Sequence, residues 1–387
     1  MWCIGLGLGV AAYAYLGYPL LLKVLGLFIR RPLRLEEPAE WPLISYMLPA
    51  YNEEASIAAA LDRILASDYP ADRRQIVVGS DASTDGTDEI VRSYADRGVE
   101  LLRMPERSGK TATENAIRSL MRGEIIVHVD AAVQISPSAT KLLVMAFGDP
   151  EVGAASSRDV STASPGETTV SGEGSYVGYE MWVRRLETRV YGITGVSGSF
   201  FANRGSLPLA LTPNALSRDF AAAMVARRQG LRSVSVDQAI CYVPRSPSLR
   251  REYRRKVRTM TRGLETLWFH RDLLNPFRYG LFAWMLASHK LSRWLALPGV
   301  LVAAVGWVLL DLNSHSLPLA TLLAAVALLA AAGWFWPEHR RAPRVVAFTA
   351  FVVSGVVATF VAWYRALRGE LDPVWEPTRR GSATPPR

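Results

Sequence analysis

The chain of 387 residues is long enough for two to three domains, and half of its residues are hydrophobic, a balance typical of membrane proteins. Its two cysteines, Cys3 and Cys241, lie far apart and fit no disulfide or metal-binding spacing, which argues against a disulfide framework. The formal net charge is +9, yet no run combines clustered Lys and Arg with stacking aromatics, so we expect no nucleic-acid partner. Many arginines flank apolar segments instead, and an anionic lipid bilayer explains them better.

The first apolar segment predicts an N-terminal transmembrane helix over residues 1–30. Residues 2–29 are apolar apart from Lys23, and a hydrocarbon core needs about 20 such residues. Arg30, Arg31 and Arg34 follow and predict that the carboxyl end lies in the cytoplasm. The alternative is a cleaved signal peptide, which would need a basic start and a small-residue cleavage site, and the segment has neither.

After a Pro/Glu linker at residues 36–42, residues 43–130 repeat a pattern of strand, loop and helix three times. The apolar runs are Leu43–Leu48, Gln75–Gly79 and Glu124–Val129, and polar residues follow each of them. Helical composition follows the first loop at Ala55–Ala66. Such alternation predicts an α/β fold with a parallel sheet, whose ligands bind outside the carboxyl ends of the strands. We interpret residues 43–130 as the nucleotide-binding half of an enzyme.

Six motifs occur in a fixed order along residues 43–267. They are Pro49-Ala50-Tyr51-Asn52-Glu53, Ser80-Asp81-Ala82-Ser83-Thr84-Asp85-Gly86-Thr87, Gly109-Lys110 with Asn115, Gly195-Val196-Ser197-Gly198-Ser199-Phe200-Phe201-Ala202, and Ser217-Arg218-Asp219-Phe220 followed by Arg255-Lys256-Val257-Arg258. This series resembles the inverting family-two glycosyltransferases with the GT-A fold, and is similar to cellulose synthase and poly-N-acetylglucosamine synthase-like enzymes. The resemblance implies a Rossmann-like mixed sheet in a catalytic domain over residues 43–270, with the acceptor half at 131–270.

The first three motifs predict the donor site. Asp81 can accept hydrogen bonds from a base or ribose, while Glu53 and the backbone from Pro49 to Asn52 could line the same cleft. The alternative for each residue is ordinary loop capping. Lys110 precedes a predicted helix at 112–121 in a segment too short for a phosphate-binding P-loop. The resemblance implies that Lys110 shapes the donor site, and the alternative is a solvated lysine at a helix start. The predicted donor-binding residues are Pro49, Ala50, Tyr51, Asn52, Glu53, Asp81, Lys110 and Asp130.

Asp130 is the predicted metal ligand. The resembled family carries Asp-x-Asp here, which holds a divalent ion on the diphosphate, but this chain has Ala132 at the second position. Mg²⁺ and Mn²⁺ take hard oxygen ligands and can rely on one or two carboxylates plus substrate phosphates. Asp130 could therefore serve alone, and the missing carboxylate leaves metal dependence open.

The acceptor half contains the predicted general base, Asp219. Inverting transfer needs a base that removes the proton of the acceptor hydroxyl. The family's acidic residue before it is Arg218 here, which could lower the pKa of the base if the side chains approach. The alternative for Asp219 is an N-terminal cap of a helix at 221–229. In the same half we expect helices at 137–147 and 173–190, a strand at 152–156 and a mobile loop at 161–174.

Four further residues are predicted to bind the acceptor or the diphosphate. The resemblance assigns Ser197 and Gly198 to the acceptor side. Arg255 and Arg258 lie three apart on a predicted helix at 247–269 and so share a face. A solvated or headgroup-facing arginine face is the alternative, because further arginines lie on that helix. The family's closing Trp is Thr259 here.

The C-terminal part predicts membrane attachment. Residues 275–297 mix aromatic and basic residues as an amphipathic interfacial helix would. Three apolar segments follow at 298–310, 317–336 and 345–363, within a transmembrane region at 298–364 and before a tail at 365–387. Loop charges place 311–316 outside and the arginines at 340–344 inside. Three spans would then leave the arginine-containing tail outside, so either the last segment does not cross or the orientation rule is overridden.

Together these observations predict inverting transfer of a sugar from a nucleotide-sugar donor, a UDP-sugar, to a membrane-associated glycan or lipid-linked acceptor. The protein would be integral to the inner or plasma membrane with a cytoplasmic catalytic domain. We expect a role in cell-envelope polysaccharide biosynthesis alongside other synthesis or export proteins. The alternative is a degenerate relative that binds nucleotide or partner proteins without transfer, motivated by Ala132, Arg218 and Thr259. Transport alone fits less well, because over half of the chain lies between the hydrophobic regions.

Overall fold

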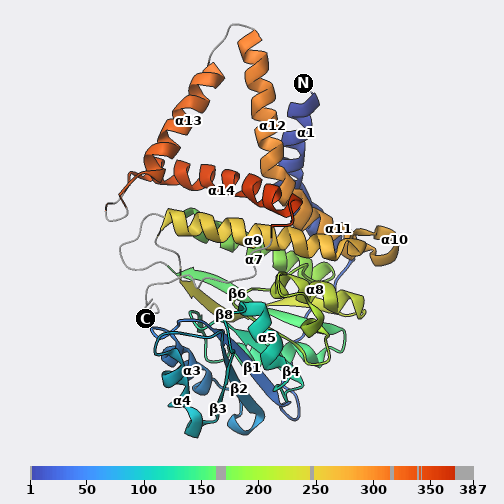
Figure 1. Ribbon diagram of the computed structural model, residues 1–387. Helices are drawn as coiled ribbons and strands as arrows, with labels where there is room; N and C mark the ends of the chain where they lie inside the picture. Colours follow the sequence, from blue (N-terminus) through green and yellow to red (C-terminus); the bar gives the residue numbers. More distant parts are fainter. Residues whose placement is uncertain are drawn as a thin grey trace. The chain divides into compact units, whose positions relative to one another are not determined.

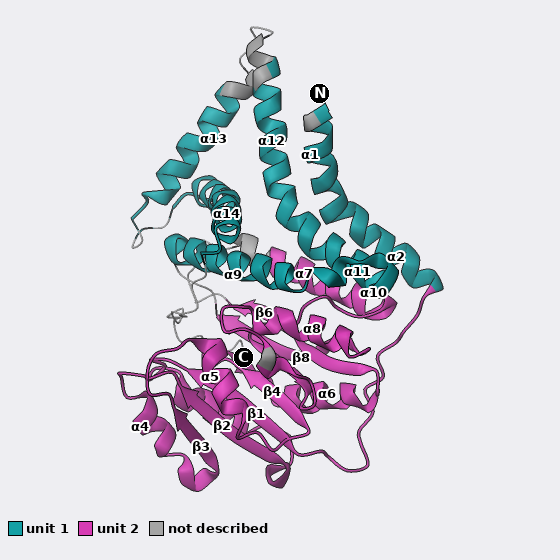
Figure 2. Ribbon diagram, turned by 45° about the vertical axis from the view of Figure 1, so that its right-hand side comes forward, with its two compact units in different colours: residues 1–28, 165–173, 246–370 teal, residues 29–164, 174–245, 371–387 magenta. Residues whose placement is uncertain are grey.

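The computed structural model describes residues 2–162, 171–244, 248–313, 318–337, 340 and 342–370. The chain divides into two compact units, coloured separately in Figure 2. Unit 1 comprises residues 1–28, 165–173 and 246–370, and unit 2 comprises residues 29–164, 174–245 and 371–387.

Unit 2 contains one mixed sheet of eight strands in the order β3-β2-β1-β4-β7-β6-β8-β5 (Figure 1). Strands β3, β2, β1 and β4 run parallel, β7 is antiparallel to both β4 and β6, and β8 is parallel to β6 and antiparallel to β5. The predicted α/β class with a mixed, Rossmann-like sheet is confirmed. The strands are β1 (Ile44–Ala50), β2 (Arg74–Ser80), β3 (Val99–Arg103), β4 (Ile125–Val129), β5 (Gln134–Ile135), β6 (Val152–Thr162), β7 (Phe200–Arg204) and β8 (Arg232–Pro244).

Helices cover both faces of the sheet. Consecutive residues of a strand point to opposite faces, so neighbouring residues of β1 pack against different helices. On one face Tyr46 and Leu48 of β1 belong to a core that includes residues of α3 and α6. On the other face Met47 packs with Ile117 of α5. All seven residues of β1 are buried, as expected of a central strand covered twice. The helices of this unit are α3 (Ile57–Leu65), α4 (Thr87–Arg92), α5 (Lys110–Arg118), α6 (Ala139–Met145), α7 (Ser171–Val190, from residue 174 on) and α8 (Arg218–Arg228).

The structure differs from the sequence prediction at several strands. β1 continues through Pro49 and Ala50, which were expected in the following loop. A proline is tolerated there because the ladder from β1 to β4 ends at Met47, so only β2 still pairs with this end of the strand. Strands β3, β5, β7 and β8 were not predicted, and β6 is longer than the expected 152–156. Of the mobile loop predicted at 161–174, residues 163–170 lie outside the described residues.

Unit 1 is helical. Its main elements are α1 (Trp2–Ala12), a turn of π-helix at Tyr13–Gly17, α2 (Tyr18–Phe28), α9 (Leu249–Phe269), α10 (Pro276–Tyr279), α11 (Leu281–Leu286), a turn of π-helix at Ala287–Leu291, α12 (Ser292–Asn313), α13 (Pro318–Trp334) and α14 (Arg344–Leu367). Helix α1 packs so closely on α12 that a Cβ atom at Gly7 would lie 2.1 Å from the carbonyl oxygen of Gly299. Only glycine permits that approach.

Three helices of the described chain are long and apolar enough to cross a membrane. They are Ile4–Phe28, Leu281–Val308 and Arg344–Leu367, while the helix at Thr321–Trp334 is shorter. The interfacial helix predicted at 275–297 and the span predicted from 298 on share one helical run, which continues from Leu281 to Asn313. Gly280, whose φ is +56°, separates this run from the preceding helix α10.

Pro298 lies inside this helical run, and a proline removes the N–H that would bind the carbonyl four residues earlier. That carbonyl belongs to Trp294, and here it accepts a hydrogen bond of 3.1 Å from the indole Nε1 of Trp363 in α14. The helix can therefore pass through Pro298 without an unsatisfied acceptor.

Candidate functional site

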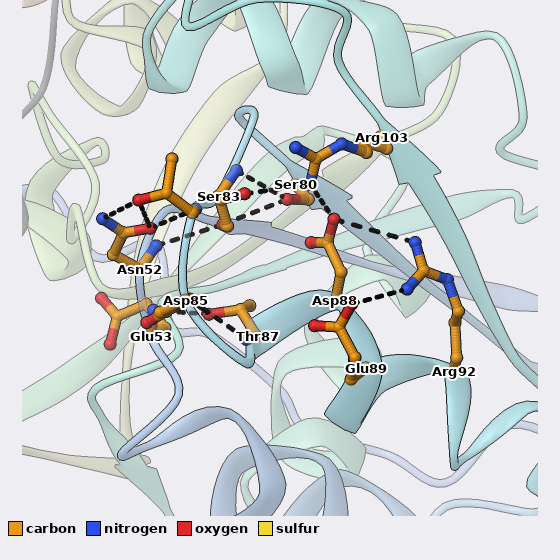
Figure 3. Close-up of polar contacts among 11 residues, drawn as sticks. Asn52, Glu53, Ser80, Ser83, Asp85, Thr87, Asp88, Glu89, Arg92 and Arg103 are labelled. Atoms are coloured by element: carbon orange, nitrogen blue, oxygen red, sulfur yellow. Dashed lines mark hydrogen bonds and ion pairs between the residues drawn. The ribbon is translucent and has the colours of Figure 1, made fainter.

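Hydrogen bonds connect the loop that follows β1 to the loop that follows β2 (Figure 3). The side-chain oxygen of Asn52 accepts the backbone N–H of Thr84 at 2.8 Å, and the N–H of Asn52 donates to Ser83 Oγ at 3.1 Å. The N–H of Glu53 donates to Thr87 Oγ1 at 2.9 Å. Asn52 and Ala82 both have positive φ, 52° and 55°, which is uncommon for residues other than glycine. The two loops thus form one braced structure at the carboxyl ends of the strands.

Asp81 is buried at the end of β2 and anchors a third loop. Its Oδ1 accepts the backbone N–H of Ser108 at 2.7 Å, and its Oδ2 accepts that of Gly109 at 2.9 Å. Gly109 immediately precedes α5 and has φ of +91°, a conformation that favours glycine. For Asp81 the contacts seen are those of the loop-capping alternative, and its role towards a donor stays a prediction.

The anchored loop delivers Lys110, the first residue of α5, into a cluster of charged residues. Lys110 Nζ lies 2.5 Å from Asp130 Oδ1, at the end of β4, and 3.3 Å from the carbonyl oxygen of Gly198. Both charged side chains are 22% exposed, so the solvated-lysine alternative is wrong. Burial opposes the charged form of Lys110, but the carboxylates of Asp130, Glu114 and Asp219 together raise the pKa of its ammonium group.

Asp219 lies beside Gly198, whose carbonyl oxygen Lys110 contacts. A Cβ atom at Gly198 would lie 2.8 Å from Asp219 Oδ2, so the carboxylate sits directly against this glycine. Ser217 occupies the N-cap position of α8, and its hydroxyl donates to Asp219 Oδ1 at 2.6 Å. Asp219 is therefore in the first turn and is not the cap. Four separate segments thus meet here: Lys110 begins α5, Asp130 follows β4, Gly198 precedes β7 and Asp219 lies in α8.

Ser197, the neighbour of Gly198, contacts a carboxylate that sequence reasoning missed. Its hydroxyl lies 2.8 and 2.7 Å from the two carboxylate oxygens of Asp159 in β6. Burial raises the pKa of Asp159, while Arg184 and the two serine hydroxyls oppose that rise. The signal in the sequence was weak, because Asp159 lies inside a strand of which only the first half was predicted.

Behind Lys110 and Asp219 lies a buried polar network, which was also missed. Arg218 Nε is 2.9 Å from Glu114 Oε2, and His128 Nδ1 is 3.8 Å from Glu114 Oε1. Burial opposes ionisation of Glu114, but His128, Arg218 and Lys110 together lower the pKa of its carboxyl to about 2. Burial lowers the pKa of His128. Arg218 was expected to act on Asp219, and the structure instead directs its guanidinium to Glu114.

Arg255 and Arg258 lie on α9, in unit 1. The guanidinium of Arg255 donates to both carboxylate oxygens of Glu252, at 2.8 and 2.7 Å. The predicted binding of diphosphate or acceptor by Arg255 and Arg258 joins residues of both units and stays a prediction.

Within the described part of the chain no three or more His, Cys, Asp or Glu side chains come together as a metal cluster. Asp130 is the carboxylate at the predicted position, and its Oδ1 is engaged by Lys110. A divalent ion at Asp130 would therefore take one protein carboxylate and draw its other ligands from water and substrate phosphates, as Mg²⁺ often does.

Parts of the chain are similar in sequence to known glycosyltransferases. Residues 45–207 match the family described as Glycosyl transferase family 2. A beta-monoglucosyldiacylglycerol synthase of Nostoc is 26% identical over 185 residues, which make up 46% of this chain and 39% of that protein. A dolichyl-phosphate beta-glucosyltransferase of Trichomonas vaginalis is 38% identical over 95 residues, 22% of this chain and 28% of that protein. The matched segments thus span less than half of these relatives' length.

A solved structure is similar over nearly the whole chain. The mannosyltransferase PcManGT from Pyrobaculum calidifontis, in complex with GDP-Man and Mn²⁺, superposes with a TM-score of 0.69. It is 22% identical in sequence, and the match covers 95% of this chain and 99% of that one. The likeness shows the fold, and the predicted GT-A architecture is confirmed.

Proposed function

Because residues 45–207 carry a glycosyl transferase family 2 domain, we propose that the protein is an inverting glycosyltransferase that moves a sugar from a nucleotide-sugar donor to a membrane-associated acceptor. The observation that carries the proposal is the meeting of Lys110, Asp130 and Asp219 around Gly198, beyond the carboxyl end of β4. That edge of an α/β sheet is where ligands bind.

The proposed chemistry assigns a charge to each requirement of the reaction. Asp219 accepts the proton of the acceptor hydroxyl while the anomeric carbon is attacked from the face opposite the diphosphate. The Lys110 ammonium group offsets negative charge on the departing nucleoside diphosphate. A divalent ion held by Asp130, when bound, would supply further positive charge for the same purpose. Pro49, Ala50, Tyr51, Asn52, Glu53 and Asp81 form or brace the donor cleft, and UDP is the proposed nucleotide.

The proposed acceptor is a lipid or a lipid-linked glycan. The three long apolar helices of the described chain support membrane association. The names of two relatives refer to lipids, a diacylglycerol and dolichyl phosphate, which favours a lipid acceptor here as well. We place the protein in the inner or plasma membrane with its catalytic domain cytoplasmic, in the synthesis of cell-envelope polysaccharide.

The test is incubation of membranes containing the protein with a panel of labelled nucleotide sugars, followed by sizing of the labelled product. A ladder indicates polymerisation, and a single lipid-soluble species indicates one-step transfer. Asp219→Asn should keep donor affinity within a few-fold and lower turnover by about 10² to 10⁴, because it removes only the proton-accepting charge. Asp96→Asn, at an exposed carboxylate, should match the parent. Parent-like turnover of Asp219→Asn would assign the base elsewhere.

The same assay separates the non-catalytic alternative. A protein that only binds nucleotide or scaffolds partners would release no nucleoside diphosphate with any donor, whereas a transferase releases one per sugar moved. The departure at Arg218 no longer favours that alternative, because Glu114 supplies the opposite charge.

A further inference from the structure

We propose that Glu114 is a positioning residue that holds the three charged groups of the site, Lys110, Asp130 and Asp219, at fixed separations. The inference rests on the proposed function, since it concerns the geometry of that site. Glu114 touches none of the expected reacting atoms and acts through the elements that carry them.

The first contact joins α5 to α8. Glu114 lies four residues after Lys110 on α5, so both side chains project from the same face of the helix. Its carboxylate pairs with Arg218, the residue immediately before Asp219, and each of these two side chains is only 3% exposed. Asn115 reinforces the joint, because its Oδ1 accepts from Arg218 Nη2 and its Nδ2 donates to Asn214 Oδ1 at 2.9 Å.

The second contact joins α5 to β4. His128 lies in β4, two residues before Asp130, and its Nδ1 is 3.8 Å from Glu114 Oε1. The imidazole is held from its other sides, with Nε2 2.8 Å from Asn203 Oδ1 and the ring stacked on Phe201 at 4.1 Å between centroids. Glu114 thus lies on the helix that begins with Lys110 and contacts His128, near Asp130, and Arg218, next to Asp219.

The pair also accounts for the charge reversal at position 218. A guanidinium that is buried without an opposite charge is strongly unfavourable. Glu114 provides that charge from another helix, so α8 can begin with Arg218 and still present Asp219 beside Gly198. Arg218 therefore belongs to the support of the site.

The test compares Glu114→Gln, Arg218→Gln and the double variant with a control ion pair in the same unit. Asp149 and Arg232 form that control, with 2.6 Å between Oδ2 and Nη2; Arg232 is buried and Asp149 is partly buried. We expect each single variant at the network to lower kcat of the folded enzyme about tenfold to a hundredfold, because small misplacements of reacting groups have effects of that size. The double variant should lose no more than the worse single variant. Asp149→Asn should lose thermal stability and keep kcat within twofold.

Parent-like kcat in folded Glu114→Gln would overturn the proposal, whatever its melting temperature. Should Glu114→Gln fail to fold, Glu114→Asp replaces it, since it keeps the charge but is one methylene shorter and draws the carboxylate away from Arg218 and His128. Its kcat should fall about tenfold, and an unchanged kcat would refute the positioning role. Should the parent transfer no sugar, the proposed function fails, and hydrogen exchange decides this inference by itself. Amides at 218–221 should then exchange at least about tenfold faster in the network variants than in Asp149→Asn, and equal rates would overturn it.

Discussion

Replacement of Asp81 separates a loop anchor from a donor ligand. Its carboxylate accepts two backbone N–H groups, from Ser108 and Gly109, in a buried position. A hydrogen bond to a charged group contributes about 1.5 to 3 kcal/mol, so Asp81→Ala should lose roughly 3 to 6 kcal/mol. In a unit of this size each kcal/mol moves the melting temperature by about 2 to 4 °C. The nucleotide-free variant should therefore melt roughly 6 to 24 °C below the parent. Asp81→Asn keeps one acceptor oxygen and should lose about half as much.

The assay is thermal unfolding of the purified protein followed by tryptophan fluorescence, with and without nucleoside diphosphate. Asp72→Ala is the control, because this carboxylate is 81% exposed and should change stability by no more than about 0.5 kcal/mol. If Asp81 served only to bind the base or ribose, the nucleotide-free melting temperature would stay at the parent value while nucleotide affinity fell. That result would refute the anchoring argument.

Three further outcomes are expected. The pKa of Glu114 is lowered to about 2 from an unfolded value of 4.5, so its stabilisation is present above pH 4.5 and is lost as the pH falls towards 2. Unfolding followed at several pH values should show this loss in the parent and not in Glu114→Gln. Excess chelator should slow transfer if Asp130 binds a metal, and full activity would mean that Lys110, Arg255 or Arg258 neutralises the departing charge. Ala82→Gly should raise the free energy of unfolding by up to about 1 kcal/mol in a denaturant titration, because φ is +55° there; a loss would mean that the added chain entropy outweighs the strain.

The nucleotide-binding half could be predicted from sequence because its signals are local. β1, β2 and β4 are buried runs that end in polar loops, and adjacent residues define each of them. β3 escaped prediction because it is a short edge strand, with most of its residues only partly buried. The site residues Lys110, Asp130 and Asp219 could be named from resemblance, but their common position depends on how distant strands are ordered.

The supporting network could not be predicted for the same reason. Glu114 and Arg218 are neighbours in space and about a hundred residues apart in sequence. One signal was available: a carboxylate four residues after Lys110, on the buried face of an otherwise ordinary helix, together with an arginine where the resembled family has an acid. In the sequence each residue is only an unexpected charge, and the fold shows that the two opposite charges pair with each other.

Packing within unit 1 bears on the tail orientation that loop charges left unresolved. Helix α14 is long and apolar enough to span, yet its middle lies against α9. Lys256 Nζ of α9 is 3.6 Å from the ring centroid of Phe351, and a Cβ atom at Gly355 would lie 3.6 Å from the same nitrogen. A charged residue at the bilayer centre costs about 2.5 to 3.5 kcal/mol on insertion scales, and α9 carries six arginines besides Lys256. We therefore expect α14 to lie in the membrane surface beside α9, with both of its ends on the cytoplasmic side. Alkaline phosphatase fused after Asn313 should be active outside the cytoplasm and the same enzyme fused after Arg387 should be inactive, whereas activity at the second junction would mean that α14 crosses.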